Sequence, residues 1–421
     1  MNYLSLSVLL ALSLFNITIQ ASNYQIREKL KKITNSLPRG TNFGVMVLNP
    51  LTNDTVFAIN HRLSLIPASN TKLFTTGVAL ALMGSDYQIA TKIFSDKVQE
   101  KDGKINGNLY IKGFGNSLFT DRDLDKMVQT LLDKGVTSIN GDIIADDSYF
   151  DQHYSRFDWI EDEKTNVHLP PVSALVINRN QIVTAVKRRK RFVNVHSKIA
   201  DPPAYIAELL SKKLQSAGIQ VFGKSAKGLT PDAAYELSSS SVPLKNILSI
   251  VNKQSDNFLA ECLFKTVGAV ASGKEGSAFN AAQNINKFII ENDIESKGTK
   301  IVDGSGLSRY NQITVGSIVS LLEYIYLNLK YYEAFLNTLS IAGVDGTLGG
   351  RMGSSSAEFN FRGKTGTLNG ASSVSGYLKT KNGDDLIVSM IFEFSKGGIN
   401  HFRKIQDQII EIIAEYDEIS G

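Results

Sequence analysis

The chain has 421 residues, of which 43% are hydrophobic and 20% charged, and this composition favours a soluble globular protein of one large domain or two to three smaller ones. A net charge of +4 gives no reason to expect nucleic acid as a partner. The single cysteine, Cys262, excludes an intrachain disulfide, and in its apolar surroundings we expect it to be a small buried side chain.

Residues 1–21 are predicted to be a secretory signal peptide. The apolar run from Leu4 to Phe15 is too short to span a bilayer, and Ala21 is a suitable small residue before a cleavage site. The segment has no Lys or Arg at its start, and a buried first helix is the alternative. We therefore expect an exported protein of a bacterial periplasm or cell surface.

The next segments predict a hairpin and then a helix. Residues 43–60 hold two alternating runs, FGVMVLN and TVFAIN, on either side of the turn NPLTND. An apolar helix is expected to start at Ser69 and to stop near Gly84. Short alternating stretches then mix with short helices over residues 87–237, which indicates a separate β-rich unit.

The second half of the chain returns to helical patterns and then to strands. Three β-type runs follow the helices, and Asn382-Gly383 joins the last two as a strong hairpin signal. An amphipathic helical pattern closes the chain. Strands near both ends predict an α+β fold in which one antiparallel sheet is flanked by helices. This discontinuous domain would consist of residues 22–86 and 238–421, with residues 87–237 inserted as a β-rich region.

Three short motifs in this framework carry chemistry. The S-x-x-K and K-T-G patterns each occur once, and a Ser-Asp-Asn lies between them in the chain. Each motif alone is weak, but the ordered set is typical of penicillin-binding proteins and class A β-lactamases. The motifs are Ser69-Asn-Thr-Lys72, Ser255-Asp-Asn257 and Lys364-Thr365-Gly366-Thr367.

The first two motifs have the parts of an activated nucleophile. A serine hydroxyl needs a base within hydrogen-bond reach, and a spacing of three places Lys72 on the same helix face as Ser69. Lys72 would be that base if its surroundings lower its pKa enough to leave it neutral. Ser69 would attack a carbonyl near the positive end of the helix dipole. Ser255 and Asn257 would relay a proton and hold the substrate amide.

The third motif is expected to bind substrate. Lys364 and Thr365 would bind a terminal carboxylate, and Gly366 would let the substrate lie against the strand edge. The backbone N–H groups of Ser69 and Thr367 would form an oxyanion hole. This chemistry requires no cofactor. The five histidines are scattered, and neither a metal-ligand spacing nor a G-x-S-x-G motif offers a different mechanism.

Together with several longer stretches, these motifs resemble one family, the D-alanyl-D-alanine carboxypeptidases/endopeptidases of the class C low-molecular-mass penicillin-binding proteins. GNLYIKGFGNSLFTDRDL, GDIIADDSYFD and PPVSALVINRN are similar to the family's inserted domains, and DGSGLSRYN and AGVDGTLGGRM are similar to its catalytic domain. The resemblance covers nearly the whole chain after the predicted signal. The long gap between Ser69 and Ser255 is where the family carries its insertion.

The resemblance implies a serine β-lactamase-like penicillin-binding domain that acts on peptidoglycan stem peptides ending in D-Ala-D-Ala. It implies an acyl-enzyme on Ser69, which β-lactams would also acylate, and it implies no cofactor. Residues at four further positions match places where relatives contact the substrate's diaminopimelate side chain, although the last falls where a relative has a longer amide: Asp146, Phe150, Arg309 and Asn369.

Other hypotheses remain open at this stage. A β-lactamase or esterase could use the same fold, and Glu333-Ala-Phe-Leu-Asn337 fits the E-x-x-L-N motif that supplies the deacylating glutamate in class A β-lactamases. Because Glu333 sits in a long apolar helical pattern, we expect it on a helix surface. A catalytically inactive wall-binding protein is the alternative outside enzymes. The basic run at residues 186–192 predicts a solvated strand or turn, or peripheral attraction to an anionic polymer or membrane surface.

Overall fold

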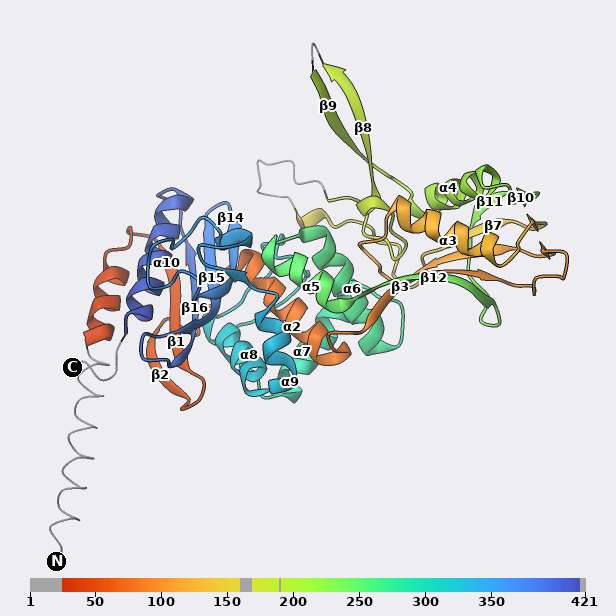
Figure 1. The fold of residues 1–421 in the computed structure, drawn as a ribbon. Helices are drawn as coiled ribbons and strands as arrows, with labels where there is room; N and C mark the ends of the chain where they lie inside the picture. The colour runs from red at the N-terminus through yellow and green to blue at the C-terminus, as the bar shows by residue number, and fades with distance from the viewer. Residues whose placement is uncertain (1–24, 160–168, 189–190, 417–421) are drawn as a thin grey trace, which may run out of the picture.

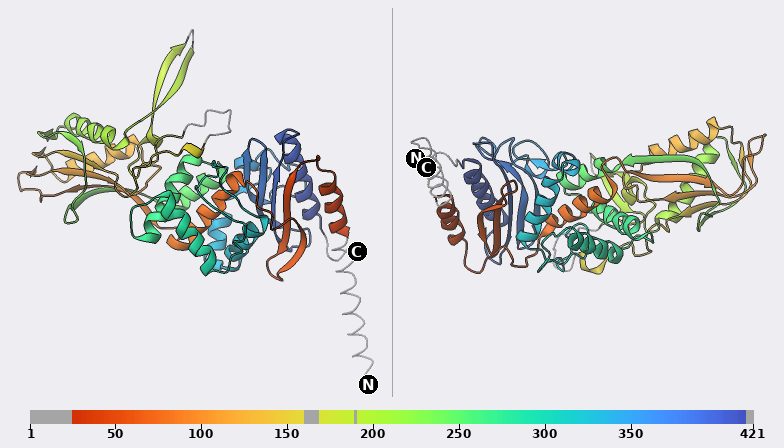
Figure 2. Two further views of the ribbon diagram at one scale, coloured as in Figure 1. Left: turned by 180° about the vertical axis from the view of Figure 1, so that it is seen from behind. Right: turned by 90° about the horizontal axis from the view of Figure 1, so that it is seen from below.

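The structure is a computed structural model that describes residues 25–159, 169–188 and 191–416. The predicted signal peptide lies outside the described residues. The molecule is elongated, and a sheet, a helical layer and the inserted unit follow one another along its length (Figure 1). Figure 2 shows the same order from two further sides.

The first layer is a six-stranded antiparallel sheet in the order β13-β14-β15-β16-β1-β2. The first hairpin of the chain pairs directly with the last strand, which confirms the prediction of one antiparallel sheet built from both ends. The strand β15 is buried at nearly every position because helices cover both faces. The strands are β1 Asn42–Asn49, β2 Asp54–Ile59, β13 Ser340–Ile341, β14 Arg362–Leu368, β15 Ala371–Lys379 and β16 Asp385–Glu393.

One face of this sheet is covered by the C-terminal helix α10 (Ile399–Ala414) and by the helical residues 25–35. The apolar side chains Ile405, Ile409 and Ile413 of α10 are spaced by four residues, as expected for a helix with one buried face. The predicted closing helix is thus confirmed; it packs on β15 and β16, and its Arg403 reaches Thr367 of the motif strand β14.

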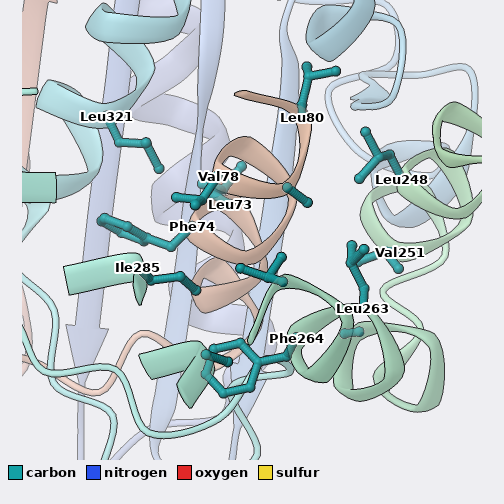
Figure 3. Packing of buried hydrophobic residues seen from close by; sticks show 14 of the residues in the cluster. Leu73, Phe74, Val78, Leu80, Leu248, Val251, Leu263, Phe264, Ile285 and Leu321 are labelled. Carbon is teal, nitrogen blue, oxygen red and sulfur yellow. The ribbon is translucent and has the colours of Figure 1, made fainter. Parts of the chain in front are cut away.

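The other face carries a helical layer whose central member is α2 (Thr71–Met83). The first ten residues of α2 are buried, polar and apolar alike, because other helices surround it. Leu73, Phe74 and Val78 of α2 pack among residues of neighbouring helices (Figure 3). Each such side chain stabilises the fold by about 1.5–3 kcal/mol, which holds α2 firmly. The neighbours are α5 Leu244–Lys253, α6 Asn257–Ser272, α7 Ala278–Glu291, α8 Val315–Leu327 and α9 Leu329–Leu336.

The inserted unit has sheets of its own. A five-stranded sheet in the order β11-β7-β5-β3-β12 and a three-stranded sheet in the order β10-β6-β4 pack with two helices around a separate core. The elements are β3 Gln88–Ser95, β4 Lys104–Ile105, β5 Leu109–Gly113, α3 Asp121–Asp133, β6 Ser138–Ile139, β7 Ile143–Asp146, α4 Pro202–Ser216, β10 Gln220–Val221, β11 Ser225–Lys227 and β12 Tyr235–Pro243.

The end of this unit lies further along the chain than its sequence indicates. Strand β12 pairs with β3 as far as Pro243, beyond the predicted limit at residue 237. The reason is its sequence, ELSSSSVP, which lacks the alternation of apolar residues that marks a strand. Backbone pairing, rather than a buried apolar face, therefore defines this strand.

A two-stranded hairpin, β8 (Gln181–Arg188) and β9 (Arg191–Lys198), projects from the inserted unit (Figure 1). The basic run at residues 186–192 falls at its tip, and residues 189–190 lie outside the described residues. The described side chains of β9 are almost all exposed, as expected of a solvated strand.

Candidate active site

The three predicted motifs come from three different elements and meet at one place. Ser69 lies in a short 3-10 turn, Ala68–Asn70, that leads into α2, so the regular helix begins two residues later than predicted. Ser255 and Asn257 lie where α5 gives way to α6, and Lys364 lies on β14. The rigid α2 and the paired β14 hold the nucleophile turn between them.

Lys72 has the geometry of a base for Ser69. Its Nζ lies 2.9 Å from Ser69 Oγ, 2.7 Å from Asn257 Oδ1 and 2.5 Å from the carbonyl oxygen of Ser305. The side chain is fully buried on the first turn of α2. Three fixed hydrogen-bond contacts therefore hold the amine beside the hydroxyl that it would deprotonate.

The surroundings of Lys72 make its neutral form more accessible than that of an exposed lysine. Burial lowers the pKa of Lys72 to about 8, because water no longer solvates the ammonium form, and the acidic groups Asp303, Glu261 and Asp256 oppose this change. At pH 7 roughly a tenth of the molecules would then carry a neutral Lys72. That fraction is large enough for a general base.

Lys364 is the second buried lysine of the site. Its Nζ donates to Ser255 Oγ at 2.8 Å and to the carbonyl oxygen of Thr365 at 2.7 Å. Burial, and then the nearby Lys72, hold the pKa of Lys364 well below its usual value. A carboxylate that entered the site would raise this pKa again, because it would supply the missing opposite charge.

The loop that carries Ser255 is strained. Ser255 has a φ of +57°, in the left-handed region that non-glycine residues adopt at a cost of about 1–3 kcal/mol. The next residue, Asp256, caps α6 by accepting from the N–H of Leu259 at 2.9 Å. Arg179 of the inserted unit pairs with the same carboxylate at 2.5 Å. The inserted unit thus directly supports the second motif, a contact that no sequence pattern indicated.

Two buried acids behind the motifs are also absent from the sequence prediction. Glu261 lies one turn after Asn257 on α6, and its carboxylate accepts from the N–H of Ser305 at 2.7 Å. The carbonyl of that same residue accepts from Lys72. Burial, followed by the nearby Asp303, raises the pKa of Glu261 to about 8, and burial also raises the pKa of Asp303. The sequence feature that could have indicated Glu261 is its spacing of four residues from Asn257, which places both side chains on one face of α6.

The glycine of the third motif is required by packing. A Cβ at Gly366 would lie 2.2 Å from Ser373 Oγ, 2.7 Å from the oxygen of Pro67 and 2.9 Å from the backbone nitrogen of Ser69. Asn70 joins the same elements, because its Nδ2 donates to Ser373 Oγ at 2.6 Å. Gly366 therefore lets β14 approach the backbone of the nucleophile turn.

A Gly366→Ala variant is expected to be acylated by penicillin at least about tenfold more slowly, because the added methyl group must displace the N–H of Ser69. The rate of adduct formation by mass spectrometry measures the effect. Gly398→Ala is the matched control, since a Cβ at Gly398 meets nothing within 4 Å. Equal acylation rates in the two variants would contradict this account of Gly366.

A cavity of about 780 Å³ opens over the motifs. Five of the predicted residues line it, whereas Lys72 and Lys364 are buried beneath them: the lining residues are Ser69, Ser255, Asn257, Thr365 and Thr367. The Thr365 hydroxyl also donates to that of Thr347 at 2.8 Å. The catalytic and carboxylate-binding candidates thus share one opening.

The four residues matched through the diaminopimelate contact lie in two places. Arg309 Nη2 donates to the carbonyl oxygen of Asn369 at 2.5 Å, so these two residues lie together just beyond β14. Asp146 and Phe150 do not line the cavity. The carboxylate of Asp146 is fully buried, where it accepts from two backbone N–H groups and pairs with Lys112 at 3.0 Å. Phe150 is buried, 5.7 Å from the ring of Tyr149.

Glu333 of the E-x-x-L-N match is exposed on α9, as expected, and it is not among the residues that line the cavity. A glutamate that activates the deacylating water must reach the acyl group. The placement of Glu333 therefore gives no support to class A β-lactamase chemistry.

Comparisons with known proteins identify the family of the chain. The model of the D-Ala-D-Ala carboxypeptidase 3 (S13) family matches residues 26–199 and 188–416. D-alanyl-D-alanine carboxypeptidase DacB of Haemophilus influenzae is 27% identical over 428 residues, with 87% of this chain and 88% of the relative covered. D-alanyl-D-alanine carboxypeptidase of an Actinomadura species is 26% identical over 442 residues, with 89% and 81% covered.

The crystal structure of penicillin binding protein 4 from Haemophilus influenzae has the same fold, with a TM-score of 0.81, 24% identity, and 92% of this chain and 99% of that chain covered. The family model accounts for almost all of the described residues, including all three motifs. The chain therefore belongs to the D-Ala-D-Ala carboxypeptidase 3 (S13) family and is a serine-type D-Ala-D-Ala carboxypeptidase.

Proposed function

We propose that Ser69 is the nucleophile of this carboxypeptidase and Lys72 its general base, acting on peptidoglycan stem peptides. The observation that carries the proposal is the 2.9 Å contact between Lys72 Nζ and Ser69 Oγ, at a lysine whose pKa burial lowers to about 8. Neutral Lys72 takes the hydroxyl proton as Ser69 Oγ attacks the carbonyl carbon of the penultimate D-alanine. The N–H groups of Ser69 and Thr367 stabilise the resulting oxyanion.

Collapse of the tetrahedral intermediate breaks the peptide bond. The proton held by Lys72 passes by way of the Ser255 hydroxyl, which lies 2.8 Å from Lys364 Nζ, to the leaving amine of D-alanine, and Lys72 is neutral again. Water then attacks the ester on Ser69 as Lys72 accepts its proton, and Lys72 returns that proton to Ser69 Oγ as the shortened peptide is released. Because acid and base steps alternate on the same groups, no cofactor is needed.

Substrate binding uses the groups around the nucleophile. The terminal carboxylate pairs with Lys364 and accepts from the hydroxyl of Thr365. Asn257 Oδ1 accepts a hydrogen bond from Lys72, and its amide nitrogen therefore remains to donate to the peptide of the substrate. Arg309 and Asn369 lie together beyond β14 and are proposed to contact the substrate's long side chain. Asp146 and Phe150 are left out of this role because both side chains are buried, whereas Arg309 is half-buried and Asn369 is exposed.

The same chemistry extends to two further reactions. Cross-linked stem peptides present a D-alanyl bond to the same serine, and their cleavage would be D,D-endopeptidase activity. β-Lactams present a strained amide, and after ring opening the leaving group stays attached. A crystal structure of penicillin binding protein 4 from Haemophilus influenzae contains a β-lactam. In this chain the proposal rests on Ser69 and its neighbours.

A location outside the cytoplasm follows from the substrate, and the proposed route is the signal at residues 1–21. No helix within residues 25–159, 169–188 and 191–416 is long and apolar enough to cross a bilayer. Peripheral attachment to the wall or membrane surface is proposed for the basic run on the β8–β9 hairpin, which projects from the inserted unit.

Intact-mass measurement after addition of penicillin tests the proposed function. We expect an adduct of one drug per chain that maps to Ser69 and persists while the free drug stays intact. A short-lived adduct with accumulating hydrolysed penicillin would instead identify a β-lactamase. No adduct at Ser69, together with no release of D-alanine from a D-Ala-D-Ala peptide, would overturn the proposal in favour of a wall-binding role.

A further inference from the structure

The cavity over the motifs continues well beyond them, toward the first turns of α10. Its wall there consists of Arg351, in the loop before β14, and of Arg403, Lys404 and Asp407 on α10. Thr365 and Thr367 of β14 connect this end to the nucleophile. In the proposed mechanism the β14 motif holds the carboxylate of the leaving residue. The α10 end is therefore the side on which the leaving group departs.

The cations of this wall differ in whether they have an ion-pair partner. Arg351 is neutralised by Asp407, whose Oδ1 accepts from its Nε at 2.9 Å and its Nη2 at 2.7 Å. Arg403 is half-buried, and its recorded side-chain partner is neutral, the hydroxyl of Thr367 at 3.1 Å. Among the described residues, no carboxylate forms an ion pair with Arg403 or with the exposed Lys404. The wall thus has two unneutralised cations.

The surroundings of Arg403 disfavour a charge that has no partner. Burial and the neighbouring Arg351 lower the pKa of Arg403, and the more weakly acting Asp407 opposes them only in part. An anion bound at this place would relieve both effects. Guanidinium groups bind carboxylates with good geometry, and charge-assisted hydrogen bonds of this kind are stronger than neutral ones.

The volume of the cavity points to a leaving group larger than D-alanine. A space of about 780 Å³ is in the range that holds a drug-sized ligand. D-Alanine would place only a methyl group and one carboxylate on this side, and Lys364 and Thr365 already account for that carboxylate. The second stem peptide of a cross-link would fill the space and bring further carboxylates to it.

We propose that Arg403 and Lys404 form a leaving-side subsite that binds a carboxylate additional to the one held by the β14 motif. The subsite gives the enzyme a preference for anionic leaving groups larger than D-alanine, as in a cross-linked peptide. This inference rests on the proposed function, because the acyl-enzyme on Ser69 defines which side is the leaving side.

Three synthetic substrates with one common acyl part test the subsite. Their leaving groups are D-alanine, D-2-aminoadipate, whose side chain ends in a carboxylate, and the side-chain amide of D-2-aminoadipate. All three carry the same α-carboxylate, so they separate the two sources of negative charge. The ratio of kcat/KM for the acid to kcat/KM for the amide is the readout. Arg403→Gln, Lys404→Gln and the double variant are compared with the wild type.

We expect the wild type to prefer the acid over the amide about tenfold or more, and the double variant to lose most of that preference. Lys396→Gln is the control, because Lys396 is an exposed cation shortly before α10 that does not line the cavity. This control should keep the wild-type ratio. Added salt should reduce the preference in the wild type and have little effect on it in the double variant.

Two results would overturn the subsite. One is an equal loss of rate on all three substrates in Arg403→Gln, which would mean that Arg403 binds the shared α-carboxylate. The other is a wild type that does not distinguish acid from amide. Failure of the proposed function looks different, because the wild type would then cleave none of the three substrates and form no penicillin adduct on Ser69.

Discussion

A Ser69→Ala variant is expected to release D-alanine from a D-Ala-D-Ala peptide at less than about a thousandth of the wild-type rate. Loss of a serine nucleophile removes the covalent route and leaves only binding and the oxyanion hole. The fold should persist, since the recorded contact of Ser69 Oγ is its hydrogen bond with Lys72. D-Alanine measured with a coupled oxidase gives the rate.

The variant should also form no penicillin adduct. Ser64→Ala is the control, because Ser64 is an exposed serine that donates to the carbonyl of Gly298 and lies outside the cavity. It should keep the activity and the adduct. Continued release of D-alanine by Ser69→Ala at a substantial rate would show that another group is the nucleophile.

Replacement of Lys72 by methionine should lower the rate of acylation by about 10²–10⁴-fold, which is the range for a general base. Methionine fills similar space in this fully buried position without a charge to desolvate. We therefore expect the melting temperature at neutral pH to be at least that of the wild type. An inactive variant that is also unfolded would not support Lys72 as the base, so the melting curve is measured together with the acylation rate.

The pH dependence of the acylation rate is a second test of Lys72 as the general base. Burial lowers the pKa of Lys72 to about 8, so the wild-type acylation rate should rise with pH, bend near pH 8 and level off above it. Below the bend, each pH unit should lower the rate about tenfold, because the protonated amine cannot accept the serine proton. Lys72→Met should lack this rise. A wild-type profile that is flat between pH 6 and 9 would contradict Lys72 as the base.

The candidate catalytic set could be proposed from the sequence because its members are defined by short-range spacing and chain order. Ser69 and Lys72 lie on one helical turn, and the other two motifs each occupy a few consecutive residues. The antiparallel sheet could be predicted because the runs of its first hairpin alternate and Asn382-Gly383 marks its last hairpin. Strand β12, which runs past the predicted limit at residue 237, could not be recognised because its serines give no apolar alternation, and its pairing with β3 depends on the folded backbone.

What the sequence does not show are contacts between distant segments. Glu261 reaches Lys72 only through the peptide of Ser305, which lies on another loop. Arg403 has the appearance of a surface residue on an amphipathic helix, and only the packing of α10 on the sheet brings it to Thr367. Asp146 shows the opposite case. Its position matches a substrate contact of relatives, but in the structure its carboxylate accepts hydrogen bonds from backbone N–H groups.

The ion pair between Arg179 and Asp256 bears on how such an enzyme could be shortened. Asp256 caps α6 next to the strained Ser255, and its cationic partner comes from the insertion. The guanidinium of Arg179 also lies over the ring of Phe258, at 5.7 Å. A chain trimmed to the sheet and its helices would expose that ring and leave the capping acid without its partner. A shortened enzyme would therefore need another cation beside Asp256 to hold this loop.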